Sequence, residues 1–450
     1  MMNMTVIQTR SRLDELLGLE YYISRTPPIN GKIRKHPLDF KVFEVFKNGI
    51  VLINPDEIRF LYSKIRGLYS IYTLTKCNLP FNLIEIWIKN TFKSKNVGFS
   101  GIKDSRAFTS QFVSIASEYV FDKVGLIFSE SRYLSLSLLG SSPRGIAIGD
   151  NLGNVFNILI RELILNVKSL FKIIDQILKD MHKHGGLPNY FGYQRFGTIR
   201  PNTHIVGKYL LLKDFKSAVL ELLTTVYPYE SERSKRARLF LKETLDYKRA
   251  LNLFPPSLRY ERILIKHLAK NNGDYEGAIL RLPLWLRRLF IEAYQAYLFN
   301  KILSRRLSMG LLVNDVIPGD VVFFYNSGTF KKIVKEFEIE LAKECIELGL
   351  ASLQLPLIGS SFNLTEHFAD EIILDILDEE GISLDCFKNP RPVVPSIKGT
   401  FRPISCIPTI YEIQYYRSTL LLNFFLPRGS YATVFLREIL KPEDPYLAGF

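Results

Sequence analysis

The sequence has few of the residues that usually bind metal ions. Its 450 residues include 4 cysteines and 6 histidines, and the cysteines stand far apart. No two of them have the short spacing that a zinc site or a thioredoxin-like redox centre requires. His182 and His184 are close, but a spacing of two does not place both rings on one face of a helix. We therefore expect buried free thiols and no structural metal.

Signatures of membrane proteins and of nucleotide-dependent enzymes are also missing. No segment approaches the roughly 18 unbroken apolar residues that a membrane helix requires, and the first residues lack the apolar core of a signal peptide. There is no GxGxxG after a strand, no glycine-lysine-serine/threonine loop, no GxSxG elbow and no HExxH pair. We therefore expect a soluble cytoplasmic chain whose chemistry needs neither a nucleotide cofactor nor a metal.

Positive charge is what the sequence has in excess. Lysine and arginine number 59 against 45 acidic residues, a formal net charge of +14. Residues 366–380 contain seven acidic residues and no lysine or arginine, so the rest of the chain is more basic still. Basic patches suit a polyanion, because each neutralised phosphate releases counterions. The alternative is that these side chains simply solvate helix faces, and charge alone leaves both interpretations open.

Strand patterns dominate the first third of the chain. Residues 38–54 alternate apolar and polar side chains on either side of Asn48 and Gly49, which predicts a β-hairpin. Short strand patterns then follow one another closely as far as residue 160. Closely spaced strands with few intervening helices favour a mixed or antiparallel sheet over a doubly wound one.

A helical block interrupts this pattern. Between residues 163 and 182 apolar residues recur at intervals of three and four, which predicts one long helix that stops at Gly185 and Gly186. Residues 208–307 are mostly amphipathic helix patterns, and the proline-rich stretch 388–396 is the best linker candidate after them. Strand patterns then return, and the last element is a strand or a helix. This order predicts an α+β fold in which both ends of the chain meet in one sheet around an insertion.

Three segments combine polar and aromatic residues and are the candidates for chemistry. They are GFSGIKDSRAFTSQ at residues 98–111, GNVFNILIR at 153–161 and GGLPNYFGYQRFGTIRPN at 185–202. RNA recognition uses such ingredients, because bases stack on rings for roughly 1–3 kcal/mol each while amide and guanidinium groups contact base edges and phosphates. A glycine-punctuated turn whose rings fill a domain junction accounts for the third segment equally well. Asp104, taken alone, is most simply a turn or cap residue.

Read in order, these segments resemble the TruD family of tRNA pseudouridine synthases. Five motifs carry the resemblance, and the helix EAYQAYLFNKILSRRL is also similar to one in the family. The motifs are PLDFKV at Pro37, GIKDSRAFTSQ at Gly101, GNVFNILIR at Gly153, NYFGYQRFG at Asn189 and LPRGSYAT at Leu426. The resemblance implies a pseudouridine synthase fold, with a mixed or antiparallel sheet flanked by helices and interrupted by a TRUD insertion domain. It also implies a V-shaped molecule that binds RNA in the cleft between the two domains.

The resemblance, with the composition, places the domain boundaries and the site. We expect the catalytic domain in residues 1–185 and 394–450 and the insertion in 186–393. The family's catalytic aspartate falls on Asp104. Arg34 stands where bacterial members have a lysine, so it keeps the charge but not the shape, and Lys35 is an alternative. The residues expected to contact the RNA are Arg34, Lys103, Arg106, Asn154, Phe156, Asn189, Gln194 and Arg195.

Roles follow for several of these residues. Phe156 corresponds to the aromatic ring that stacks on the target base, and Asn154 to the adjacent amide. We expect Arg34 to pair with Asp104, because a nearby cation favours the charged carboxylate. We expect Lys103 and Arg106 to contact RNA phosphates.

The implied reaction is the isomerisation of uridine to pseudouridine. It breaks the N1–C1′ bond, turns the uracil and rejoins it through C5, so no atoms are gained or lost and no cofactor is required. An aspartate can serve as nucleophile or as base. We expect a monomer that modifies tRNA, at uridine 13 of the D arm as in the best-known members. The alternatives are a tRNA-binding folding chaperone with weak or lost catalysis, and a synthase for another tRNA position or another RNA.

Overall fold

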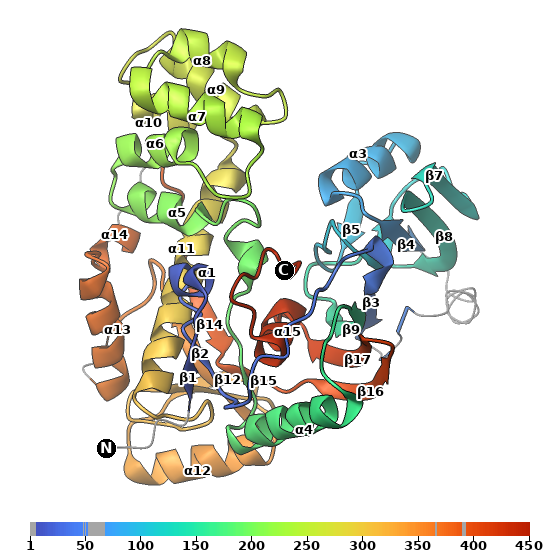
Figure 1. Cartoon of the computed structure of the whole chain (residues 1–450), viewed down its shortest axis with the longest axis vertical. Coiled ribbons are helices and arrows are strands. Elements are labelled where there is room, and N and C mark those ends of the chain that lie inside the picture. The colour runs from blue at the N-terminus through green and yellow to red at the C-terminus, as the bar shows by residue number, and fades with distance from the viewer. Residues whose placement is uncertain (1–5, 48, 50, 53–67, 365–366, 389–392) are drawn as a thin grey trace. The chain divides into compact units, whose positions relative to one another are not determined.

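The computed structural model consists of two compact units (Figure 1). It describes residues 6–47, 49, 51–52, 68–364, 367–388 and 393–450. The first unit comprises Met1–Thr26 and Ile177–Ser405, and the second comprises Pro27–Gln176 and Cys406–Phe450. Each unit is therefore built from two separate stretches of the chain.

The second unit is organised around a nine-stranded mixed sheet. Its strands follow the order β16-β17-β9-β3-β6-β4-β8-β7, and β5 also pairs with β6. The pairing of β3 with β6 is parallel, and the other strand pairs of this sheet are antiparallel. The mixed sheet predicted from the sequence is thus confirmed. The strands are β3 (Phe40–Phe46), β4 (Tyr69–Cys77), β5 (Val97–Phe99), β6 (Phe108–Ile115), β7 (Lys123–Ser129), β8 (Arg132–Ser142), β9 (Asn151–Ile160), β16 (Thr409–Tyr416) and β17 (Thr419–Pro427).

Two distant parts of the sequence meet in this sheet. Strand β17 pairs with β9 from Leu420 opposite Ile160 to Pro427 opposite Gly153, and Figure 1 shows the red strands beside the green one. The expectation that both ends of the chain share one sheet is therefore confirmed.

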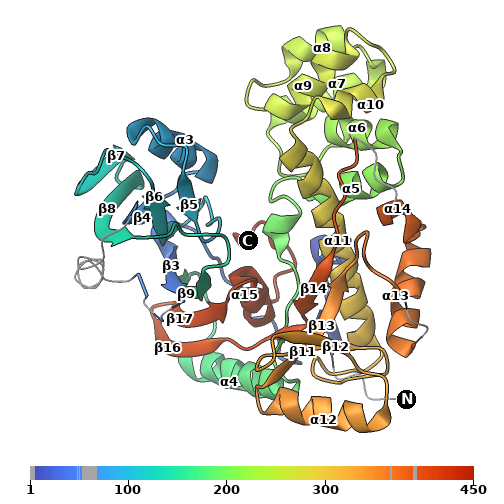
Figure 2. The same cartoon turned by 180° about the vertical axis from the view of Figure 1, so that it is seen from behind.

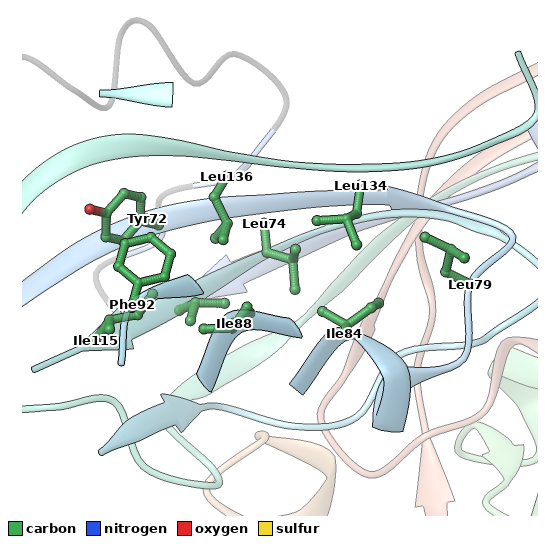
Figure 3. Close-up of a cluster of buried hydrophobic side chains, with 10 residues drawn as sticks. Tyr72, Leu74, Leu79, Ile84, Ile88, Phe92, Ile115, Leu134 and Leu136 are labelled. Atoms are coloured by element: carbon green, nitrogen blue, oxygen red, sulfur yellow. The ribbon is translucent and has the colours of Figure 1, made fainter. Parts of the chain in front are cut away.

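Helix α3 (Phe81–Thr91) covers part of one face of the sheet. Its buried residues Ile84 and Ile88 pack on Leu74 of β4 and Leu134 of β8, as Figure 3 shows. Removing a side chain of this size from water stabilises the fold by roughly 1.5–3 kcal/mol. Among the described residues of this unit three further helices begin, namely η1 (Pro37–Asp39), α4 (Val167–Lys183) and α15 (Ala432–Leu440). The last element of the chain, left open between strand and helix, is the helix α15.

The long helix predicted over residues 163–182 is present as α4, which starts at Val167, since residues 162–166 belong to neither a helix nor a strand. It ends before Gly185 and Gly186, whose φ values of 78° and 123° suit glycine. Of the predicted hairpin, β3 forms and a bridge joins Val45 to Val51, while residues 50, 53 and 54 of the return arm lie outside the described residues. Its turn residue Asn48 lies outside the described residues.

The first unit contains the helical block. The long helix α11 (Leu284–Ser308) packs against α5 (Thr203–Leu211). Gly207 permits this, because a Cβ there would lie 2.0 Å from the carbonyl oxygen of Phe290. Figure 2 shows α5 to α10 gathered at one end of α11. The shorter helices are α1 (Arg12–Leu16), η2 (Tyr193–Arg195), α6 (Phe215–Thr224), α7 (Glu232–Thr244), α8 (Tyr247–Leu253), α9 (Arg259–Leu268), α10 (Tyr275–Leu280), α12 (Glu336–Glu347), α13 (Phe368–Glu379) and α14 (Asp385–Lys388).

A four-stranded sheet of order β12-β11-β13-β14 completes the first unit. All three of its strand pairs are antiparallel. The strands are β11 (Val321–Phe324), β12 (Thr329–Lys332), β13 (Ala351–Leu357) and β14 (Thr400–Pro403), and the remaining short strands of the chain are β1 (Ile7–Gln8), β2 (Tyr21–Tyr22), β10 (Leu187–Pro188) and β15 (Ser405–Cys406). The predicted insertion, residues 186–393, lies within this unit, and its boundaries stay a prediction.

Two smaller expectations can be compared with the structure. All four cysteines are free, but only Cys77 and Cys406 are buried, whereas Cys345 and Cys386 are partly exposed. Of the linker candidate at 388–396, residues 389–392 lie outside the described residues.

Over the part of the chain that is described, none of the helices is both long and apolar enough to span a bilayer.

Candidate active site

Asp104 lies in the loop that joins β5 to β6 in the second unit. Its Oδ2 is 3.2 Å from Nη2 of Arg34, and the two side chains are 20% and 5% exposed. The predicted pairing of Arg34 with Asp104 is therefore confirmed. The carboxylate is the more accessible member of the pair, as a group that meets a substrate would have to be.

Arg34 is fixed by contacts on three sides. Its Nη1 donates to the carbonyl oxygen of Gly449 at 3.0 Å, and its guanidinium carbon lies 4.0 Å from the ring centroid of Phe40. Burial lowers the pKa of Arg34, and the charge of Asp104 acts in the opposite direction. An arginine nevertheless stays protonated, so the carboxylate faces a permanent and well-oriented cation.

Lys35, the alternative partner, points to another carboxylate. It forms an ion pair with Glu162, which also binds Lys32 at 2.9 Å. Hydrogen bonds from these two lysines lower the pKa of Glu162 to about 2. Arg34, and not Lys35, is thus the cation that the fold brings to Asp104.

Lys103 is buried and ties the loop to the sheet. Its Nζ lies 2.8 Å from Oε1 of Glu44 and donates to Oδ1 of Asn154 at 2.7 Å. Glu44 and Asn154 are direct neighbours across β3 and β9. We expected Lys103 to contact phosphates, whereas its ammonium group is engaged here with protein side chains, a geometry that suits the positioning of Asn154.

Glu44 is a member of this cluster that the sequence interpretation missed. It is fully buried, and it accepts hydrogen bonds from Ser100 and from the backbone N–H of Phe112, the latter at 2.9 Å. The available signal was its position in FKVFEVF, where it takes an inward place in the alternation of β3. A carboxylate at such a place requires a buried partner.

Phe156 lies on the same face of β9 as Asn154, since alternate residues of a strand share a face. Its ring stacks on Phe424 with a centroid distance of 5.3 Å and meets Phe40 edge-on at 6.2 Å. Phe156 is 6% exposed. Phe40, which also underlies Arg34, therefore joins the cation and the aromatic ring in one packed group.

The remaining predicted residues are spread over both units. Arg106, in the same loop as Asp104, is exposed. Asn189, Gln194 and Arg195 belong to the first unit. Asn189 is buried and binds Arg402 and the carbonyl oxygen of Pro403, at 2.9 and 3.1 Å.

The other two differ in accessibility. Arg195 pairs with Glu292 at 3.1 Å, whereas Gln194 is exposed. Within the second unit, by contrast, direct contacts join Arg34 to Asp104 and Lys103 to Asn154. This arrangement offers a partly exposed carboxylate beside a fixed cation, with an amide and an aromatic ring on β9 of the same sheet.

Comparisons with known proteins point in one direction. The family model described as tRNA pseudouridine synthase D (TruD) matches residues 16–439. The chain is 33% identical over 444 residues to a "Probable tRNA pseudouridine synthase D" of Methanococcoides burtonii, covering 96% of this chain and 98% of that one. It is 36% identical over 356 residues to the protein of the same name from Methanopyrus kandleri, covering 78% and 80%.

A solved structure gives the same result. The crystal structure of a TruD protein from Methanosarcina mazei is similar with a TM-score of 0.77 and 31% sequence identity. The similarity covers 96% of this chain and 98% of that one. The fold and the sequence therefore agree over nearly the whole length.

Proposed function

The chain belongs to the TruD family of tRNA pseudouridine synthases, and from that premise we propose that it isomerises a uridine of tRNA through the carboxylate of Asp104. The observation that carries the proposal is the pair of Asp104 with Arg34, in which the carboxylate is 20% exposed and the guanidinium is almost fully buried. The substrate position that the family resemblance favours is uridine 13 of the D arm.

The chemistry requires one activated oxygen and no external reagent. As a nucleophile, the carboxylate bonds to C1′ while N1 leaves, the uracil turns, and C5 then displaces the carboxylate. The proton on C5 is lost and one is gained at N1, so the reaction balances without a cofactor. As a base, Asp104 would instead remove a proton from the substrate. In both cases Arg34 fixes the direction of the carboxylate.

The target base must leave its stack to reach Asp104. Flipping costs a few kcal/mol, and stacking on an aromatic side chain returns roughly 1–3 kcal/mol per base. Because Phe156 is 6% exposed, a base could stack on its ring face only if a neighbouring side chain shifted. We assign it to the wall of the uracil pocket, with Asn154 held by Lys103 as the group that reads the base.

Binding of the rest of the tRNA falls to exposed residues. Arg106 is exposed in the catalytic loop and suits a phosphate. Of the three predicted residues in the first unit, Gln194 is the exposed one. Asn189 supports the fold around it through Arg402. We propose that the enzyme acts as a monomer.

The test is the substitution Asp104→Asn, which keeps the shape of the side chain and removes its charge. Pseudouridine formation should fall by at least roughly 10²–10⁴-fold, whereas the Kd for tRNA should stay within about twofold. Pseudouridine mapping of tRNA from cells with and without the protein identifies the position. An active Asp104→Asn enzyme would remove the aspartate mechanism, and rescue of a growth defect by Asp104→Ala would support the chaperone alternative.

A further inference from the structure

Lys76 is a charged residue on an apolar face of the catalytic sheet. It is fully buried on β4, where its neighbours across the strands are Thr109 of β6 and Leu134 of β8. The same face continues into the hydrophobic cluster of Figure 3, in which Leu74 and Leu134 pack against Ile84 of α3. Burying an ammonium group at such a place costs free energy unless a partner compensates.

The partner of Lys76 belongs to the catalytic loop. Its Nζ donates a hydrogen bond to the backbone carbonyl oxygen of Asp104. Burial lowers the pKa of Lys76 to about 8, and the charge of Asp104 followed by that of Cys77 acts in the opposite direction. The amine is therefore mostly protonated at neutral pH, with its charge next to the Asp104 peptide.

The loop has little regular structure of its own to hold Asp104. Residues 101–107 belong to no helix or strand. Its fixed points are instead side chains of the sheet and of the chain before it. Lys103 is anchored on Glu44 and Asn154, and the Asp104 carboxylate is anchored on Arg34. Lys76 adds an anchor on the main chain of Asp104 itself.

We infer that Lys76 is a positioning residue for the isomerisation, which holds the Asp104 peptide so that the carboxylate meets Arg34 and the substrate together. The inference rests on the proposed function of Asp104. Its physical basis is that a reacting group displaced by about 1 Å can lose 10²-fold in rate. A lysine on β4 beneath the loop controls that displacement without contacting the substrate.

The first test is Lys76→Met, which keeps the length of the side chain and removes the charge and the hydrogen bonds. The kcat for pseudouridine formation should fall by roughly 10- to 100-fold, while KM for tRNA stays within about threefold. The melting temperature should not fall, because a methionine suits the apolar face better than a buried ammonium group does. Lys89→Met, which changes a partly exposed lysine of α3 in the same unit, is the matched control.

The second test uses pH. The titratable and charged groups around Lys76 come from three places. Cys77 follows it on its own strand, and Tyr133 of β8 lies opposite Cys77. Asp104 belongs to the catalytic loop and is paired with Arg34. The ratio of kcat for the wild type to kcat for Lys76→Met should fall as pH rises through about 8, because the amine then loses its charge. The ratio cancels the titration of the RNA and of any group that both proteins share.

The outcomes separate the two claims. The inference is overturned if Asp104→Asn is inactive but Lys76→Met has the kcat of the wild type. It is also overturned if the ratio of the two kcat values, wild type to Lys76→Met, is constant from about pH 6 to about pH 9.5. In either case Lys76 has a structural role only. If Asp104→Asn is active, the proposed function itself fails. Should Lys76→Met not fold, Lys76→Arg answers the same question. Its guanidinium stays charged, so its kcat should not decline near pH 8 as that of the wild type does. If the kcat of Lys76→Arg declined in the same way as that of the wild type, the inference would be contradicted.

Discussion

Lys103 shows what the sequence could and could not reveal about single residues. Its place beside Asp104 was evident from GIKDSRAF, and a phosphate contact was the natural expectation for an exposed cation in a basic protein. The fold buries it against Glu44, 59 positions away in the sequence numbering. Only the register of β3 on β9 brings Glu44 and Asn154 within reach of one ammonium group. The pair of Arg34 with Asp104, by contrast, followed from the family resemblance, because Asp104 stands in the motif GIKDSRAFTSQ and Arg34 at the position of the bacterial lysine just before PLDFKV.

Glu44 should therefore matter for both stability and activity. Glu44→Gln leaves the Lys103 ammonium buried without its carboxylate, and breaking a buried pair in this way costs roughly 3–5 kcal/mol. We expect a clear drop in melting temperature and in kcat, with tRNA binding retained. Thermal unfolding followed by circular dichroism, together with single-turnover kinetics, measures both.

The matched control for this prediction is Glu162→Gln. Glu162 is an exposed carboxylate bound to Lys32 and Lys35, so its loss is screened by water and should change the melting temperature little. Equal effects of the two substitutions would contradict the role given to Glu44.

At the scale of helices and strands, the apolar periodicity of the sequence predicted the elements that are determined by local sequence. The long helix α4 was expected from its apolar spacing, and its end follows from Gly185 and Gly186. The last segment stayed ambiguous because VFLREIL is apolar enough for either a strand or a helix, and packing of Phe435 on Phe424 accompanies the helix. Of the return arm of the predicted hairpin, the described residues show the bridge between Val45 and Val51.

The contact between α5 and α11 carries a pH dependence. His204 of α5 is stacked on Tyr297 of α11 with a centroid distance of 4.9 Å, and burial lowers its pKa from 6.5 to about 3. The unfolded chain therefore binds one more proton than the folded chain between these values. Stability from this group is complete above pH 6.5 and is lost as pH falls toward 3, by up to roughly 1.4 kcal/mol per pH unit.

The variant His204→Phe keeps an aromatic ring and removes the titration. Urea unfolding at about pH 7.5 and about pH 5 should show a larger loss of stability for the wild type than for the variant. Parallel losses in the two proteins would show that other groups dominate the acid response.

At the scale of the whole molecule, charge governs the approach of the RNA. A chain with a formal net charge of +14 attracts a polyanion, so its affinity for tRNA should fall linearly with the logarithm of salt concentration. Single phosphate contacts then appear as changes in that slope. The overall charge could be predicted from the composition, whereas the exposure of a particular arginine could not.

Arg106→Ala should reduce the salt slope by about 1, as expected for one lost phosphate contact. Filter binding of tRNA across a salt series measures it. The control is Lys89→Ala, which changes a partly exposed lysine of α3 that already pairs with Glu85 and should leave the slope unchanged. An unchanged slope in Arg106→Ala would remove this residue from the phosphate contacts.

The pairing of β9 with β17 has a consequence for how the enzyme folds during its synthesis. Strand β9 ends at Ile160 and β17 begins at Thr419, so a ribosome that adds 5–20 residues per second needs on the order of tens of seconds to deliver the second after the first. During that interval the edge of β9 that later pairs with β17 has no strand beside it, and the carbonyl oxygen of Gly449 has not yet met Arg34. Until β17 is made, this open edge of β9 can pair with the wrong strand.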